Sequence, residues 1–125
     1  MADLERFARI LDEQAALLPR EVFQDLNLGV GVVEHAKADR HALPGRPLYV
    51  LGEYRVHPVM GRGVLLYYGS FQKVYPGLAE DALRQEIDRV LKHELTHHLE
   101  HRAGSRDLEI ADAQRLMRWQ EEDSL

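Results

Sequence analysis

The stretch Arg89-Val90-Leu91-Lys92-His93-Glu94-Leu95-Thr96-His97-His98-Leu99-Glu100-His101 contains the pattern H-E-x-x-H and lies in the most helix-like part of the sequence. Residues 81–101 contain neither Gly nor Pro. The apolar residues that recur there at close to helical spacing are Leu83, Ile87, Val90, Leu91, Leu95 and Leu99. This periodicity predicts one long helix. Because residues four apart lie on the same helix face, His93 and His97 can converge on a single metal ion.

The residue types of this pattern are those of a zinc hydrolase. Two histidines supply nitrogen ligands, and Glu94, one step round the helix from His93, can accept a proton from the water that the metal activates. The chain holds seven histidines, so the competing interpretation is a solvated, histidine-rich helix end. The helical context favours the metal site. His98 is predicted to pack toward the apolar face rather than to bind the ion.

The third metal ligand does not follow directly from the pattern. A catalytic zinc ion usually has three protein ligands and one open position. His101 continues the line of His93 and His97, but eight helical residues span about 12 Å along the axis, which is too far for one ion to bridge comfortably. Gly104 predicts the end of the helix, after which Asp107 can fold back toward the histidine pair. We therefore predict Asp107 as the third ligand. The alternatives that stay open are His101, Glu109 and Asp112.

Composition limits the remaining function classes. The length of 125 residues predicts a single compact domain, residues 1–125. A net charge of -5 argues against a nucleic-acid partner, because such binding depends on basic side chains that neutralise phosphates. The absence of cysteine excludes disulfides and thiolate metal ligands. The N-terminus lacks the apolar core of a signal peptide, and no apolar run is long enough to span a membrane. We therefore expect a cytoplasmic location and no membrane partner.

The rest of the chain predicts an α+β fold. A first helix over residues 4–18, capped by Asp3, is expected to end before Pro19. Further expected elements are a helical turn at 19–26, strands at 28–33, 48–55 and 64–68, a loop at 34–47 and a closing helix that includes 110–117. The small sheet is expected to pack against the long helix, with helices at both ends of the chain. The strand at 64–68 is expected to offer its edge to a bound peptide.

Four stretches carry a resemblance to a known family. They are Leu18-Pro19-Arg20-Glu21-Val22-Phe23, Leu51-Gly52-Glu53-Tyr54-Arg55, Val64-Leu65-Leu66-Tyr67-Tyr68, and Leu83-Arg84-Gln85-Glu86-Ile87 running into His93-Glu94-Leu95-Thr96-His97-His98. With these stretches the sequence resembles the minimal zincin-like metallopeptidases of bacteria, small single-domain proteins with an H-E-x-x-H-H motif. The chain departs from the family at Glu100, which occupies a glycine position, and at Asp107, which comes four residues later than the family's aspartate.

The resemblance implies a compact zincin-like α+β fold and a zinc-dependent peptidase. It implies that His93, His97 and Asp107 hold Zn²⁺, that Glu94 is the general base, and that the substrate is a peptide or protein. Two other functions stay open: a zinc-binding module without catalysis, in which the ion braces a small core, and a zinc hydrolase that acts on a non-peptide substrate.

Overall fold

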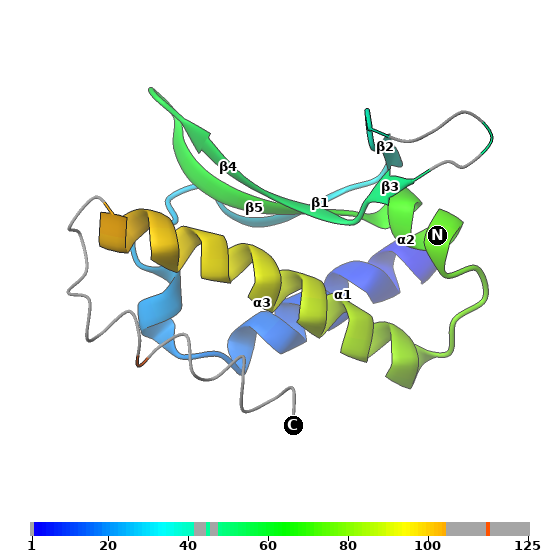
Figure 1. Cartoon of the computed structure of the whole chain (residues 1–125). Coiled ribbons are helices and arrows are strands. Elements are labelled where there is room, and N and C mark those ends of the chain that lie inside the picture. Colours follow the sequence, from blue (N-terminus) through cyan, green and yellow to red (C-terminus); the bar gives the residue numbers. More distant parts are fainter. Residues whose placement is uncertain (1, 42–44, 46–47, 105–114, 116–125) are drawn as a thin grey trace.

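The computed structural model describes residues 2–41, 45, 48–104 and 115, and the chain folds as a small sheet packed on helices (Figure 1). Its elements are α1 (Ala2–Ala16), the 3-10 helix η1 (Arg20–Phe23), β1 (Gly29–Val33), β2 (Lys37–Ala38), β3 (Tyr49–Val50), β4 (Gly52–His57), β5 (Gly61–Tyr67), α2 (Tyr68–Val74) and α3 (Glu80–Gly104). This content confirms the predicted α+β class, and the long helix forms where the sequence predicted it.

The sheet is three-stranded with the order β1-β5-β4. β1 is parallel to β5, and β4 is antiparallel to it. β2 and β3 pair separately as a short antiparallel ribbon. The helices α1 and α3 cross each other beneath one face of the three-stranded sheet (Figure 1), and α3 contacts both β4 and β5. The sheet therefore lies directly over the helix that carries the histidine pair.

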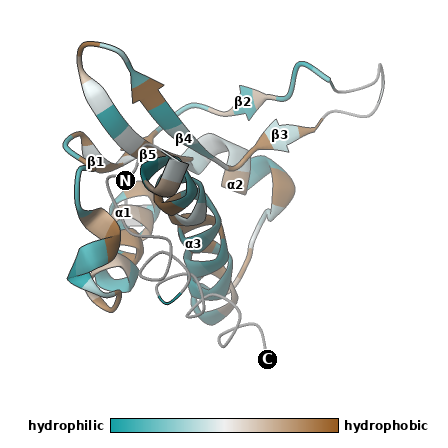
Figure 2. Ribbon diagram, turned by 60° about the vertical axis from the view of Figure 1, so that its left-hand side comes forward, coloured by the Kyte–Doolittle hydropathy of each residue, from teal (hydrophilic) through white to brown (hydrophobic). Residues whose placement is uncertain are grey.

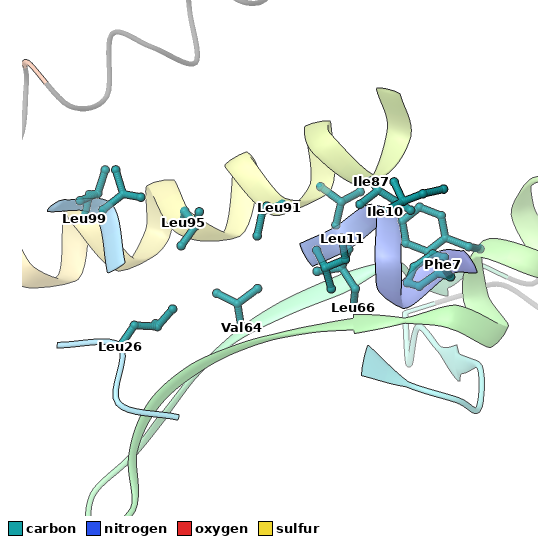
Figure 3. Packing of buried hydrophobic residues seen from close by; sticks show 13 residues of the cluster. Phe7, Ile10, Leu11, Leu26, Val64, Leu66, Ile87, Leu91, Leu95 and Leu99 are labelled. Carbon is teal, nitrogen blue, oxygen red and sulfur yellow. The ribbon is translucent and has the colours of Figure 1, made fainter. Parts of the chain in front are cut away.

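The hydrophobic core fills the space between this sheet face and the two helices. Figure 3 shows side chains from α1, α3 and β5 meeting there. Those that are at most 2% exposed include Phe7, Ile10, Leu11, Val64, Leu66, Ile87, Leu91, Leu95 and Leu99. The α3 members follow the helical period, so one stripe of α3 is buried while the His93 and His97 side chains lie on the exposed side. Each fully buried side chain of this kind contributes about 1.5–3 kcal/mol to folding.

Several predicted boundaries need correction. Asp3 lies within the first turn of α1 and not at its N-cap, where its charge still suits the helix dipole. The predicted loop 34–47 includes β2, and the predicted strand 48–55 is two strands, β3 and β4. α2 was not predicted, because its aromatic residues are typical of strands. Gly69 permits this helix: a Cβ there would lie 2.3 Å from the backbone N of Ala36.

The expected position of the substrate-binding edge was also wrong. Residues 64–67 of the predicted strand belong to β5, and Tyr68 begins α2. β5 is central in the sheet, whereas β4 lies at its edge and pairs with β5 alone among the described strands. The predicted ligand Asp107 and, apart from residue 115, the closing helix predicted around 110–117 lie outside the described residues. No helix in the described part of the chain is long and apolar enough to cross a membrane. The cytoplasmic location stays a prediction.

Candidate functional site

A close approach between β4 and α3 forms the floor of the site. Gly52, the first residue of β4, permits it: a Cβ at this position would lie 2.7 Å from Cγ1 of Val90 and 3.4 Å from Cγ of Glu94. A larger residue at this position would force either the Val90 side chain or the strand to shift. The backbone of β4 therefore lies against the helical turn that carries the H-E-x-x-H pattern.

The His93 and His97 rings converge on one another. Their Nε2 atoms are 3.2 Å apart, and the rings are perpendicular with centroids 4.8 Å apart. Two nitrogens at this separation, each about 2.05 Å from a zinc ion, would subtend an angle of about 103° at the metal, close to tetrahedral. The same separation also allows a hydrogen bond from one ring to the other. The spacing therefore fits two ligands of one ion.

Glu94 lies beside this pair but is buried, with 8% of its surface exposed. Its carboxylate accepts a hydrogen bond from the backbone N–H of Tyr54 on β4. Burial raises the pKa of Glu94, and this outweighs the opposing effects of His93, His97 and the Tyr54 hydrogen bond; the negative charge of Glu53 raises it further. A carboxylate with a raised pKa, close to two imidazoles, has the properties of a general base.

His98 faces the opposite way from this pair and is fully buried. Its Nε2 lies 2.7 Å from the backbone oxygen of Gln24, and its Nδ1 lies 2.8 Å from the hydroxyl oxygen of Tyr54. Because a carbonyl only accepts, Nε2 carries the hydrogen and Nδ1 accepts the Tyr54 O–H. Burial lowers the pKa of His98, which favours this neutral form. His98 is thus a packed residue, as predicted, and it ties α3 to β4 and to the segment after η1.

A set of charged side chains stabilises the part of β4 that borders the site. Glu53 Oε1 accepts hydrogen bonds from Lys37 Nζ, at 2.6 Å, and from the Tyr67 hydroxyl, and it lies 3.4 Å from Arg55 Nη2. Burial alone would raise the pKa of Glu53, but the bonds from Lys37 and Tyr67 hold it below its ordinary value. Glu53 therefore stays ionised and joins β4 to β2 and β5.

Two open hollows meet at Glu94 and Gly52. One extends toward the β4–β5 hairpin and is also lined by Glu53, Tyr54, Val56, His97 and His101. The other extends toward the β2–β3 ribbon and is also lined by Asp39, Tyr49, Val50, Leu51, Arg89, Val90 and His93. Together they form a cleft that follows β4, with Glu94 at its centre. Gly52, Tyr54 and Asp39 were not predicted as site residues, because their proximity to α3 arises only from strand pairing.

No third ligand joins the histidine pair within the described residues. In the part of the chain that the structure describes, no three His, Asp or Glu side chains form a group that could hold a metal ion. His101 lines the cleft but does not join His93 and His97 in a three-ligand group. Its ring lies instead near Tyr54, with the two ring centroids 6.1 Å apart. Asp107, Glu109 and Asp112 lie outside the described residues, so Asp107 stays a prediction.

Comparison with known proteins identifies a relative of known structure. The chain matches no model of a protein family and no curated protein. It is similar to the solved structure of a conserved hypothetical protein from Thermus thermophilus, with 33% sequence identity and a TM-score of 0.69. The match covers 82% of this chain and 98% of that one. At this identity and coverage, the chain belongs to the same protein family as that Thermus thermophilus protein.

Proposed function

We propose that the protein is a zinc-dependent peptidase with its active site in the cleft between β4 and α3. The observation that carries this proposal is the 3.2 Å separation of the His93 and His97 Nε2 atoms beside a buried Glu94 carboxylate. His93 and His97 would hold the ion as neutral imidazoles, and Asp107 is the proposed third ligand. A zinc ion bound there would lower the pKa of a water molecule to about 7 and polarise a carbonyl group.

Glu94 would act as the general base. Its carboxylate accepts a proton as water attacks the peptide carbonyl, and it returns this proton to the amine that leaves. Burial supports this role because a raised pKa makes the carboxylate a stronger base. The Tyr54 N–H donates a hydrogen bond to the carboxylate and so fixes its orientation.

The outer edge of β4 supports a peptide as the substrate. Leu51 O accepts a hydrogen bond from Tyr67 N at 2.9 Å, and Leu51 lies next to the register pair Gly52↔Leu66. Because bonding alternates along an antiparallel pair, the backbone groups of Gly52, Tyr54 and Val56 point away from β5. An extended peptide can therefore add to β4 as a further strand.

The test is cleavage of unfolded peptides by the zinc-loaded protein. Glu94→Gln is expected to retain zinc, measured by elemental analysis, and to lower turnover by about 10²–10⁴-fold. His97→Ala is expected to lose zinc, and Asp107→Asn to bind it more weakly. Glu5→Gln, which removes an exposed carboxylate on α1, is the matched control and should leave both zinc content and turnover unchanged.

Two results would contradict the proposal. Full turnover in Glu94→Gln would remove Glu94 as the base. Zinc binding that raises the thermal stability of the wild type, with no cleavage of any peptide, would instead support the non-catalytic module.

A further inference from the structure

Exposed apolar side chains gather at the end of the β4–β5 hairpin, next to the cleft. Val56 is 49% exposed, and Val59 and Met60, in the turn, are 88% and 60% exposed. Figure 2 shows this hairpin end, partly coloured as hydrophobic, projecting beyond the helices. Val56 also lines the hollow that contains Glu94 and His97. Apolar side chains clustered beside a cleft are typical of a surface that binds a ligand.

The backbone of this turn is held in place. The His57 Nδ1 atom accepts hydrogen bonds from the N–H groups of Val59, at 3.1 Å, and Met60, at 2.9 Å. The Asn27 side chain donates to the Met60 carbonyl at 2.7 Å and accepts from the Arg62 N–H at 2.9 Å. Because the backbone of the turn is already fixed, little backbone entropy is lost when its apolar side chains bind a ligand.

The course of a bound peptide along β4 leads to this turn. Gly52, at the start of β4, packs against Glu94, whereas Val56 lines the cleft together with His101, two turns further along α3. β4 and α3 therefore run in the same direction. A peptide that adds antiparallel to β4, which is the slightly more stable pairing, runs the opposite way. Its residues before the scissile bond would pass Val56, roughly 13 Å from Gly52 at about 3.3 Å per residue.

We propose that Val56, Val59 and Met60, here called the hairpin surface, bind apolar side chains of an extended peptide on the N-terminal side of the bond that is cleaved. The proposal rests on the proposed function, since it takes the peptide to be the substrate of the Glu94 site. Unfolded protein segments fit this surface, because alternate side chains of an added strand point to the same face. Backbone hydrogen bonds to β4 do not depend on the sequence of the peptide, so the hairpin surface supplies the selectivity for apolar side chains.

Binding to zinc-loaded Glu94→Gln protein tests this proposal without dependence on turnover. The probes are dye-labelled decapeptides of Ser, Thr and Gln that carry two leucines in the N-terminal half, two in the C-terminal half, or none. Fluorescence anisotropy should show about tenfold tighter binding of the first peptide than of the other two. The variant Val59→Ser/Met60→Ser should remove this preference. Leu17→Ser is the matched control: Leu17 is 76% exposed after the end of α1 and should have no effect.

Equal binding of the three peptides, tighter binding of the second peptide, or an unchanged preference in Val59→Ser/Met60→Ser would overturn the proposal. So would a wild-type dimer that dissociates in this variant during sedimentation, because a second copy of the chain would then cover the surface. Cleavage by the wild type is measured separately. Selective binding without cleavage would support the role of the hairpin surface but contradict the proposed peptidase. Cleavage without selective binding would support the peptidase but contradict the role of the hairpin surface.

Discussion

Removing the Tyr54 hydroxyl should destabilise the protein through its effect on His98. The Tyr54 O–H donates to His98 Nδ1 at 2.8 Å, and His98 is fully buried. In Tyr54→Phe this nitrogen keeps its place but loses its donor, because Nε2 already bonds to the Gln24 carbonyl. A buried acceptor without a partner costs about 1–3 kcal/mol, so we expect a loss of this size in the free energy of unfolding.

Urea denaturation followed by circular dichroism measures this loss. The matched control is Tyr75→Phe, whose hydroxyl donates to Glu86 at 3.0 Å. Glu86 keeps Arg89 Nε as a donor at 2.9 Å, so this change should have the smaller effect. In a His98→Leu background, Tyr54→Phe should lose most of its effect, because the acceptor is gone. A loss below about 0.5 kcal/mol in the wild-type background would show that the tyrosine–histidine bond does not hold β4 to α3.

Burial lowers the pKa of His98 below 6.5, so His98 binds a proton more readily in the unfolded chain than in the folded protein. The stabilisation that the neutral ring provides should therefore be complete above pH 6.5 and decrease as the pH falls below it. This part of the pH dependence, measured by urea denaturation, should be absent from His98→Gln. Gly52→Ala should destabilise by about 1–3 kcal/mol because its Cβ meets Val90, whereas Gly31→Ala, with 3.4 Å to Leu65 Cδ2, should be milder in the same assay. Asn27→Ala should speed hydrogen exchange at the Arg62 amide, and unchanged exchange would show that this side chain does not fix the turn.

The long helix and its histidine pair could be predicted from the sequence because both depend on local spacing. A helix fixes the relation of residues four apart, so the convergence of His93 and His97 needs no information from the rest of the chain. The order of the strands could not be predicted in the same way. Whether β4 or β5 lies at the edge depends on pairing between segments far apart in the sequence, and periodicity does not encode that choice.

The residues that support Glu94 could not be predicted either, because their positions also depend on contacts between segments far apart in the sequence. In the sequence, the Leu51-Gly52-Glu53-Tyr54 stretch carries only a family resemblance, and its physical role depends on the packing of β4 against α3. Gly52 allows the contact, and the backbone of Tyr54 binds the carboxylate. The same strand pairing brings the Tyr54 hydroxyl to His98. Sequence reasoning could assign His98 to the interior, but not its two hydrogen-bond partners.

The Tyr54 N–H already donates to Glu94, so β4 lacks one free backbone donor for a peptide that pairs with its outer edge. A guest strand opposite Tyr54 can donate its own N–H to that residue's oxygen, but its carbonyl meets an amide that is already engaged. Under the proposed function, one carbonyl of the guest is thus left unpaired at the level of the base. The outer edge of β4 would then select the peptide unit that reacts, independently of the side chains of the bound peptide.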